Sequence, residues 1–301
     1  WKKVYYNSQK GILAKLSTSA NKIMAKKLYN LFKEFLPDII ISTHFFATQI
    51  TSYLKEHENF HCTLATILTD FAPHNQWLIG KDYNDLFFVS NENMKKELIN
   101  SNVPENKIFV TGIPLSEKFS DTFNIDEIYK EHNLKRNKKV ILFFGGGEFG
   151  LGKDRTVKIL KSLIRHLNTY QIIAISGKNK KMNSEFLKIH KELEKTNNPF
   201  ISDLHIYKYT TNVPELMNIS SLVVTKPGGL TSSESLVSNA RSVYSPSKSV
   251  FAFFVAEKQE MRSFRRGARL SGNGKFQLFF VSLLTHFRGC DIISVMNLLW
   301  I

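Results

Sequence analysis

The sequence predicts an α/β protein built on two doubly wound parallel sheets. Three observations support this fold class. Short apolar segments alternate with helical segments between residues 38 and 111, the same alternation returns between 139 and 239, and glycine-rich turns follow two of the apolar segments. Strands that alternate with helices form parallel sheets, because each helix returns the chain to the start of the next strand. A chain of 301 residues suits two such domains.

The first domain, predicted over residues 1–120, opens with a basic segment. Eight lysines and no acidic residue precede Glu34, within a chain whose net charge is +15. Apolar residues recur at helical spacing over 22–36, which predicts an amphipathic helix. Such a helix can pack on the next strand, or lie on an anionic bilayer where each lysine contributes about 1 kcal/mol. Both arrangements stay open, because the lysines lie mostly off the apolar stripe.

The rest of the first domain alternates regularly. Strands are predicted at 38–43, 63–68, 86–90 and 108–111, and helices at 45–57 and up to residue 100. In open parallel sheets, ligands bind beyond the carboxyl ends of the strands. Four polar side chains follow strands here and are expected toward a ligand, with structural capping as the alternative: Thr43, His44, Asp70 and His74.

Residues 121–138 combine a short helix with a polar, charged stretch, and we predict a linker there. The second domain follows over 139–239. Its predicted strands are 139–144, 172–176, 204–207 and 222–224, and its predicted helices are 153–167, 184–194, 213–219 and a last one that begins near Thr231.

The last predicted strand runs into Pro227-Gly228-Gly229, and this turn has the character of an anion site. The Thr231 hydroxyl is expected to cap the next helix, and Glu234, three residues on, has the spacing of a capping box. A helix N-terminus behind two glycines offers free N–H groups and a dipole that favours phosphate. The alternative is a strand-to-helix turn that binds nothing.

A second turn, from Gly145 to Gly152, follows the strand 139–144. Gly145, Gly147 and Gly150 have the G-x-G-x-x-G spacing of a dinucleotide site, so an NADP-dependent oxidoreductase is one alternative. The next strand, however, ends in Ser176-Gly177-Lys178, where that fingerprint expects an acidic residue for the ribose. The dinucleotide fingerprint is therefore incomplete.

Five motifs, in order along the chain, resemble one known family. They are residues 39–44, 69–77, 108–114, 143–150 and 224–234. The pattern resembles the bacterial processive diacylglycerol glucosyltransferases and the plant-type monogalactosyldiacylglycerol synthases, relatives of the peptidoglycan glycosyltransferase that acts on lipid-linked muramyl peptide. The resemblance runs from about residue 28 to about residue 239. It implies two Rossmann-like domains facing a cleft, the GT-B arrangement, with a UDP-sugar held mainly by the second domain.

The resemblance also implies roles for individual residues. Tyr209 would lie at the uracil base, and Glu234 would accept hydrogen bonds from the ribose hydroxyls. The full donor set that it implies is Gly145, Gly146, Gly147, Ser176, Gly177, Lys178, Asn179, Tyr209, Thr225, Lys226, Pro227, Gly228, Gly229, Thr231 and Glu234. The acceptor side would include Thr43, His44 and Trp77.

The base that deprotonates the acceptor is assigned to Asp70 or His74. In the family that role usually falls to a histidine of an N-terminal Gly-Gly-Gly-His loop, which this sequence does not contain. No D-x-D motif is present, so we expect no metal and no cofactor beyond the UDP-sugar substrate. The charge of the departing diphosphate would then fall on the glycine-loop amides, the helix N-terminus at Thr231 and Lys226.

The implied activity is inverting transfer of a hexose from UDP-glucose or UDP-galactose to diacylglycerol. The expected location is cytoplasmic, peripheral on the inner face of the cell membrane and held there by anionic lipid. The two cysteines, Cys62 and Cys290, have no metal-ligand spacing and fit a reducing compartment. A catalytically inactive fragment that still binds nucleotide is the other alternative.

Residues 240–301 depart from the family pattern and are treated as a separate, divergent segment. A reading-frame shift near codon 240 is our hypothesis for the change. The basic run from Arg262 to Arg269 has neighbouring phenylalanines, but no nucleic-acid-binding module is recognisable, so nucleic acid is not an expected partner. The chain begins with Trp1, so we expect the natural N-terminus to lie upstream.

Overall fold

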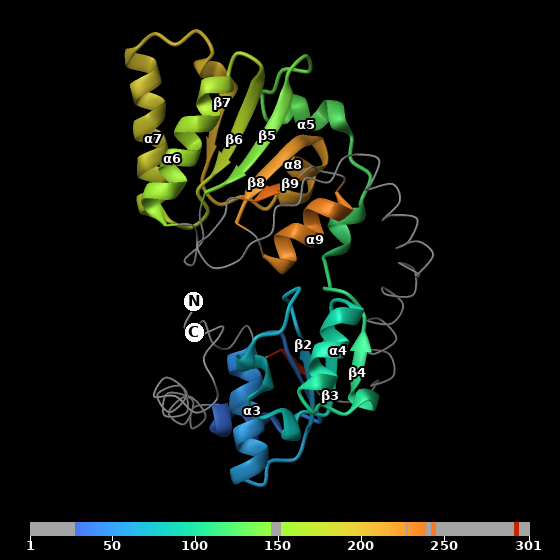
Figure 1. The fold of residues 1–301 in the computed structure, drawn as a ribbon. Helices are drawn as coiled ribbons and strands as arrows, with labels where there is room; N and C mark the ends of the chain where they lie inside the picture. Colours follow the sequence, from blue (N-terminus) through green and yellow to red (C-terminus); the bar gives the residue numbers. More distant parts are fainter. Residues whose placement is uncertain (1–27, 146–151, 227, 239–241, 245–291, 295–301) are drawn as a thin grey trace. The chain divides into compact units, whose positions relative to one another are not determined.

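The computed structural model describes residues 28–145, 152–226, 228–238, 242–244 and 292–294. The chain forms two compact units: the first ends at Pro114 and also includes residues 292–294, and the second begins at Leu115 (Figure 1). Each unit is an α/β structure on a parallel sheet, which confirms the predicted fold class. Among the described helices, none combines the length and apolar character that a bilayer crossing requires.

The sheet of the first unit has the strand order β10-β1-β2-β3-β4, and all neighbours are parallel. Its strands are β1 (Ile39–Ser42), β2 (Thr63–Ile67), β3 (Leu86–Val89), β4 (Ile108–Val110) and β10 (Ile292–Ser294). β1 to β4 lie where the sequence predicted strands. β1 to β3 are almost wholly buried, and their side chains are mostly apolar on both faces, as is usual for parallel strands.

Helices of the first unit pack on this sheet through apolar stripes. Residues 28–35 are helical, and α3 (Phe45–His57) and α4 (Glu92–Asn100) follow. Phe32 and Ile50 share a core with Ile40, so the helix at 28–35 packs on the sheet through its apolar face. Short 3-10 turns complete the unit: η1 (Asn75–Leu78), η2 (Lys81–Tyr83) and η3 (Glu105–Lys107).

The second sheet has the order β7-β6-β5-β8-β9 and is also parallel throughout. Its strands are β5 (Lys139–Phe144), β6 (Tyr170–Ile175), β7 (Leu204–Tyr207), β8 (Ser220–Thr225) and β9 (Ser242–Tyr244). The chain winds from β5 outward to β7 and then returns to place β8 on the other side of β5. The strand order therefore reverses between β5 and β8, and such a switch point is where open α/β sheets bind ligands.

Alternation along β5 divides the second unit into two cores. Ile141 and Phe143 face α6 (Lys153–Leu163) and α7 (Lys180–Lys195), whereas Val140 and Leu142 face α5 (Ile125–Glu131) and α8 (Val213–Ile219). Figure 1 shows α6 and α7 on one face of the sheet, and α5, α8 and α9 (Gly229–Val237) on the other. The remaining 3-10 turns are η4 (Glu117–Ser120), η5 (Ile164–His166) and η6 (Ile201–Asp203).

The stretch 121–138, for which we predicted a linker, contains helix α5. The Asn124 side chain caps this helix by accepting hydrogen bonds from the N–H groups of Asp126 and Glu127. Ile128 and Leu134 are buried in the core below α8. These two residues attach the stretch to the core of the second unit.

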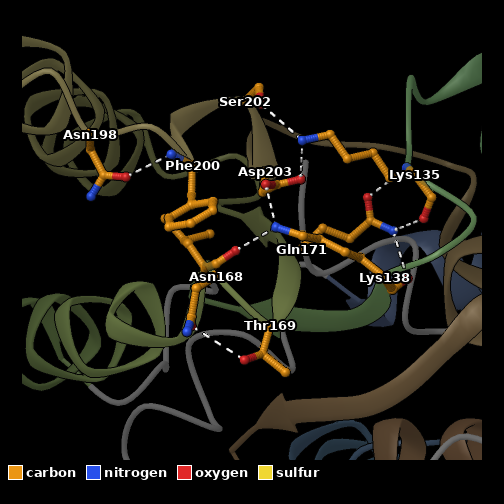
Figure 2. A network of polar contacts seen from close by, with 10 residues as sticks. Lys135, Lys138, Asn168, Thr169, Gln171, Asn198, Phe200, Ser202 and Asp203 are labelled. Atoms are coloured by element: carbon orange, nitrogen blue, oxygen red, sulfur yellow. Dashed lines mark hydrogen bonds and ion pairs between the residues drawn. The ribbon is translucent and has the colours of Figure 1, made fainter.

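A polar network centred on the buried Asp203 lies at the beginnings of β5, β6 and β7 (Figure 2). Lys135 and Lys138 pair with the two carboxylate oxygens of Asp203 at 2.8 and 2.7 Å, and the Asp203 side chain is only 1% exposed. Gln171 donates to the carbonyl groups of both lysines, at 2.7 and 2.9 Å. Burial opposes ionisation of Asp203, but the two lysines outweigh it and hold the pKa of this carboxyl below its usual value.

Candidate functional site

The candidate donor site lies at the carboxyl edge of the second sheet. Because β5, β6, β7 and β8 are parallel, the loops that follow them all emerge at one edge. These loops carry the residues predicted for the nucleotide. The loops after β5 and β8 flank the switch point, and the loops after β6 and β7 lie beside them in strand order. The topology therefore places the carboxyl ends of β5 and β8 side by side.

Gly145 lies at this edge because a larger residue would not fit there. Its N–H group is already hydrogen-bonded within the sheet. Its N–H donates to the carbonyl of Ile175 at 2.9 Å, so it already serves the sheet. A Cβ atom at this position would lie 2.2 Å from Cζ of Phe186, a fully buried ring on α7. This corrects the expectation that the Gly145 amide meets phosphate. Gly146 and Gly147, which were predicted with it, lie outside the described residues.

Helix α9 begins two residues earlier than predicted. Gly229 is its first residue, Gly228 is the N-cap, and Thr231 already lies within the first turn, so Thr231 does not cap the helix. The capping box with Glu234 is consequently absent. Glycine allows this early start because the helix packs tightly there: Gly229 is buried, and Ser232 donates from Oγ to the Gly228 carbonyl at 2.6 Å.

The N-terminus of α9 is nonetheless suited to an anion. No side chain of the described residues caps it, so the first N–H groups keep their capacity to bind a ligand. A Cβ atom at Gly228 would meet nothing within 4 Å, which leaves the backbone accessible. Thr225 is buried at the end of β8 and Lys226 is exposed beside it, whereas Pro227 lies outside the described residues. These features fit a phosphate group.

Glu234 lies on α9 and is partly buried. Burial raises the pKa of its carboxyl above the ordinary value. A carboxylate that is kept partly out of water weakens the fold, which is characteristic of residues retained for a ligand. Glu234 is therefore the strongest side-chain candidate at this edge.

The loop after β6 is fixed by its own hydrogen bonds. Ser176 is fully buried, and both its N–H and its hydroxyl donate to the Tyr207 carbonyl, at 2.9 and 3.1 Å. Gly177 takes a positive φ of 63°, which suits glycine. Asn179 caps α7 by accepting from the Met182 N–H at 3.0 Å. The Ser176 and Asn179 side chains therefore hold the loop in place.

Lys178 and Tyr209 remain available at the surface of the same edge. Nζ of Lys178 lies 5.2 Å from the centre of the Tyr209 ring, and Tyr209 is 62% exposed. A cation near an aromatic face is a favourable pairing. The exposed ring offers a flat surface on which a planar base could stack.

The first unit carries a second cluster, at the carboxyl ends of β1 and β2. The Trp77 indole N–H donates to Oδ2 of Asp70 at 3.0 Å, and Nε2 of His74 lies 3.7 Å from the same oxygen. The His74 side chain is only 2% exposed, whereas that of Asp70 is 34% exposed. Of the two predicted bases, only Asp70 is open to solvent.

Aromatic rings surround this pair. Phe45 contacts both His74 and Trp77 edge to face, with ring centres at 5.1 and 5.9 Å. His44 caps α3 through Nδ1, which accepts from the Phe46 N–H at 3.3 Å, and Thr43 precedes it, partly buried. Burial lowers the pKa of His44 and of His74, although the Asp70 charge raises both in part. Both imidazoles are therefore biased toward the neutral form.

Beneath this cluster lies a buried line of polar side chains that sequence reasoning missed. Thr48 donates to Ser42 at 2.8 Å and lies 3.0 Å from the Thr66 hydroxyl, which donates to Asn84 at 2.9 Å. All four are essentially inaccessible to solvent. The line joins β1, α3, β2 and the loop before β3, and so fixes the strand ends that carry His44 and Asp70. In the sequence these residues are isolated Ser, Thr and Asn residues within apolar segments, and this pattern does not predict that they contact one another.

Comparisons of the sequence with known proteins identify glycolipid-synthesising enzymes as relatives. Residues 1–115 match the family model of monogalactosyldiacylglycerol synthase. The processive diacylglycerol beta-glucosyltransferase of Staphylococcus carnosus is 34% identical over 239 residues, which are 78% of this chain and 58% of that protein. The protein of the same name from Bacillus cytotoxicus is 31% identical over 230 residues, 76% of this chain and 56% of its own length. The chain thus spans somewhat more than half the length of these relatives.

Solved structures share the fold at low sequence identity. UDP-GlcNAc 2-epimerase from Neisseria meningitidis, bound to UDP-GlcNAc, matches with a TM-score of 0.58 and 17% identity, over 82% of this chain and 68% of that one. MnaA of S. aureus, in a co-structure with UDP, matches with a TM-score of 0.58 and 13% identity, over 85% and 71%. At this identity the likeness concerns the fold alone. The chain is thus similar in sequence to monogalactosyldiacylglycerol synthase over residues 1–115, and to the processive diacylglycerol beta-glucosyltransferases over about three quarters of its own length.

Proposed function

We propose that this chain belongs to an enzyme that transfers a hexose from UDP-glucose or UDP-galactose to diacylglycerol. The observation that carries the proposal is the switch point of the second sheet, flanked by the uncapped start of α9 and the partly buried Glu234. The relatives named above support the acceptor, because their names specify diacylglycerol.

In this proposal the second unit holds UDP. The first N–H groups of α9 bind the diphosphate, with help from the exposed Lys226. Glu234 accepts hydrogen bonds from the ribose hydroxyls, and the exposed Tyr209 ring stacks near uracil. Charge on the departing diphosphate is then stabilised by backbone dipoles, without a metal ion.

The first unit supplies the base. The acceptor hydroxyl oxygen attacks the anomeric carbon of the sugar, the bond from that carbon to the diphosphate oxygen breaks, and Asp70 takes the hydroxyl proton. The configuration at the anomeric carbon inverts, because attack is opposite the leaving group. Trp77 orients the carboxylate through its N–H group, and the buried His74 acts as a positioning residue. Thr43 and His44 would line the acceptor side.

We further propose that the enzyme works at the cytoplasmic face of a membrane. The support is the eight lysines before Glu34 and the net charge of +15, which would attract anionic lipid. Binding to vesicles that contain phosphatidylglycerol should fall as salt rises, and deletion of residues 1–21 should weaken it while leaving UDP binding intact. Equal partitioning to neutral and anionic vesicles at low salt would contradict this electrostatic attachment.

The decisive test of the donor site is calorimetric titration with UDP. Glu234→Ala should weaken binding by about 1.5–3 kcal/mol, the range for hydrogen bonds to a charged group. Glu127→Ala is the matched control, because Glu127 is an exposed glutamate on α5 of the same unit. Unchanged UDP affinity in folded Glu234→Ala would remove Glu234 from the site. Binding of NADPH in place of UDP would favour the oxidoreductase alternative.

A transfer assay completes the test. Radiolabelled UDP-glucose and UDP-galactose, each offered with diacylglycerol in mixed micelles, distinguish the two donors by the labelled glycolipid that forms. UDP binding without transfer would leave the nucleotide-binding fragment as the correct description of this chain.

A further inference from the structure

A cluster of three potential metal ligands lies in the second unit, and none of the three is among the residues proposed to bind UDP. Glu131 is the last residue of α5, His132 follows as its C-cap, and Glu215 lies in the first turn of α8. One ligand atom from each residue lies within 4.8 Å of the other two. Since α5 and α8 pack on the same core, the cluster joins two neighbouring elements.

The histidine is oriented as a metal ligand would be. Nδ1 of His132 lies 2.9 Å from the Tyr207 hydroxyl, and Nε2 is buried without a hydrogen-bond partner among the described residues. When Nδ1 donates its proton to the hydroxyl, the Nε2 lone pair is left free. Metal-bound histidines are typically held in this way, with the second nitrogen donating to an oxygen atom.

The two carboxylates lack cationic partners. In the part of the chain that the structure describes, the ion pairs include none between a lysine or arginine and either Glu131 or Glu215. Glu131 accepts one long hydrogen bond, from Asn212 at 3.4 Å. Two carboxylates in close proximity repel each other, and a buried imidazole nitrogen without a partner is costly. One divalent cation between the three groups would relieve both costs.

We propose that Glu131, His132 and Glu215 bind a first-row divalent transition-metal ion of the zinc class. Imidazole nitrogen and carboxylate oxygen suit such ions, at bond lengths of about 2.0–2.2 Å. The exposed Glu131 side chain can move to close the remaining gap. The ion would tie α5 to α8 and, through His132 and Tyr207, to the end of β7. Its role is structural, and it takes no part in the proposed transfer reaction.

The test is calorimetric titration of the full chain with Zn²⁺, together with Co²⁺ absorption spectra. We expect one Zn²⁺ per chain whose affinity falls at least tenfold in His132→Gln and in Glu215→Gln. His166→Gln is the matched control, because His166 is exposed on η5 and outside the cluster; it should bind as the unchanged protein does. Zn²⁺ should also raise the melting temperature of the unchanged protein and of the control, and not of the two variants.

Two results would overturn the proposal. One is Zn²⁺ binding of equal affinity in folded His132→Gln and the unchanged protein, and the other is the absence of any stoichiometric binding. Should His132→Gln fail to fold, Glu215→Gln decides alone, since it preserves size and hydrogen-bonding capacity. These outcomes are independent of UDP binding, which is measured separately on the same samples.

Discussion

The indole N–H of Trp77 donates to Oδ2 of Asp70 at 3.0 Å, and this bond connects a buried ring to a carboxylate that is open to solvent. It holds the Asp70 oxygen within 3.7 Å of Nε2 of His74. The Asp70 charge therefore acts on His74 and also on His44, whose pKa values it raises against the opposing effect of burial.

Asp70→Asn should lower the pKa of both histidines further, because the charge that favours their protonated forms is lost. Titration of the histidine ring protons by NMR measures this directly, and the exposed His166 serves as an internal reference. A pKa of His74 that stays unchanged in Asp70→Asn would mean that the two side chains are not coupled as the structure has them.

The same two histidines make stability depend on pH. Their folded pKa values are lowered below the unfolded value of about 6.5, so their contribution is present above that pH and is lost as the pH falls through the folded values. His74→Phe should flatten this part of the curve of unfolding free energy against pH. If the unfolding free energy of His74→Phe depended on pH between 7 and 5 as that of the unchanged protein does, His74 would not be a source of this pH dependence.

Glu234→Gln should stabilise the protein while weakening UDP binding. Burial raises the folded pKa of Glu234, so the cost of burying its charge is absent below the unfolded value of about 4.3 and grows as the pH rises through the folded value. The variant should therefore melt higher than the unchanged protein at pH 8 and at the same temperature near pH 4. Equal melting temperatures at both values would show that the carboxylate is well solvated.

Gly145→Ala should destabilise the second unit by about 1–3 kcal/mol, the range for overpacking a close-packed core. The new methyl group would lie 2.2 Å from Cζ of Phe186. Phe186→Leu alone should leave a cavity. Combined with Gly145→Ala, it should provide the space that the alanine methyl group needs. Urea unfolding of the two single variants and of the pair forms a double-mutant cycle. If the stability losses of the two single variants simply add in the pair, contact with Phe186 is not the reason for glycine at position 145.

Asp203→Asn should cost about 3 kcal/mol at neutral pH, because it leaves two lysine ammonium groups without their buried counterion. The Asp203 pKa is lowered on folding, so its contribution is full above the unfolded value of about 3.9 and is lost as the pH falls through the folded value. Asp126→Asn is the control: its pair with Arg136 is exposed and should contribute less than about 1 kcal/mol. Similar losses in both variants would contradict this difference.

Sequence periodicity predicted most of the fold because each strand is a short apolar run and each helix has a stripe. The bounds of α3, β7 and α8 agree with prediction to the residue. Errors arose where a single side chain decides a boundary. Helix α7 begins at Lys180, four residues before the predicted start, because Asn179 caps it, and α9 begins at Gly229 because a buried glycine admits the helix there.

Side-chain partners were harder to predict than elements. Nothing in the sequence indicates that Asp203 meets Lys135 and Lys138, since these partners are more than sixty positions apart. The burial of His74 also escaped prediction, because its neighbours Phe45 and Trp77 come from different elements. The strand-end rule located both candidate sites, yet which polar groups remain accessible depends on packing that only the three-dimensional structure provides.

β8 pairs with the edge of β5 that β6 leaves free, and this has a consequence for how the chain folds. β5, β6 and β7 can assemble as each is synthesised, but the free edge of β5 stays unpaired until residues 220–225 have emerged. An apolar strand with an open edge invites pairing with other chains, and contacts of such long sequence separation form slowly. The nascent second unit therefore passes through a stage in which half its sheet is formed and its central strand is unprotected. Insertion of β8 ends that vulnerable period and, in the same event, completes the edge proposed to bind the nucleotide.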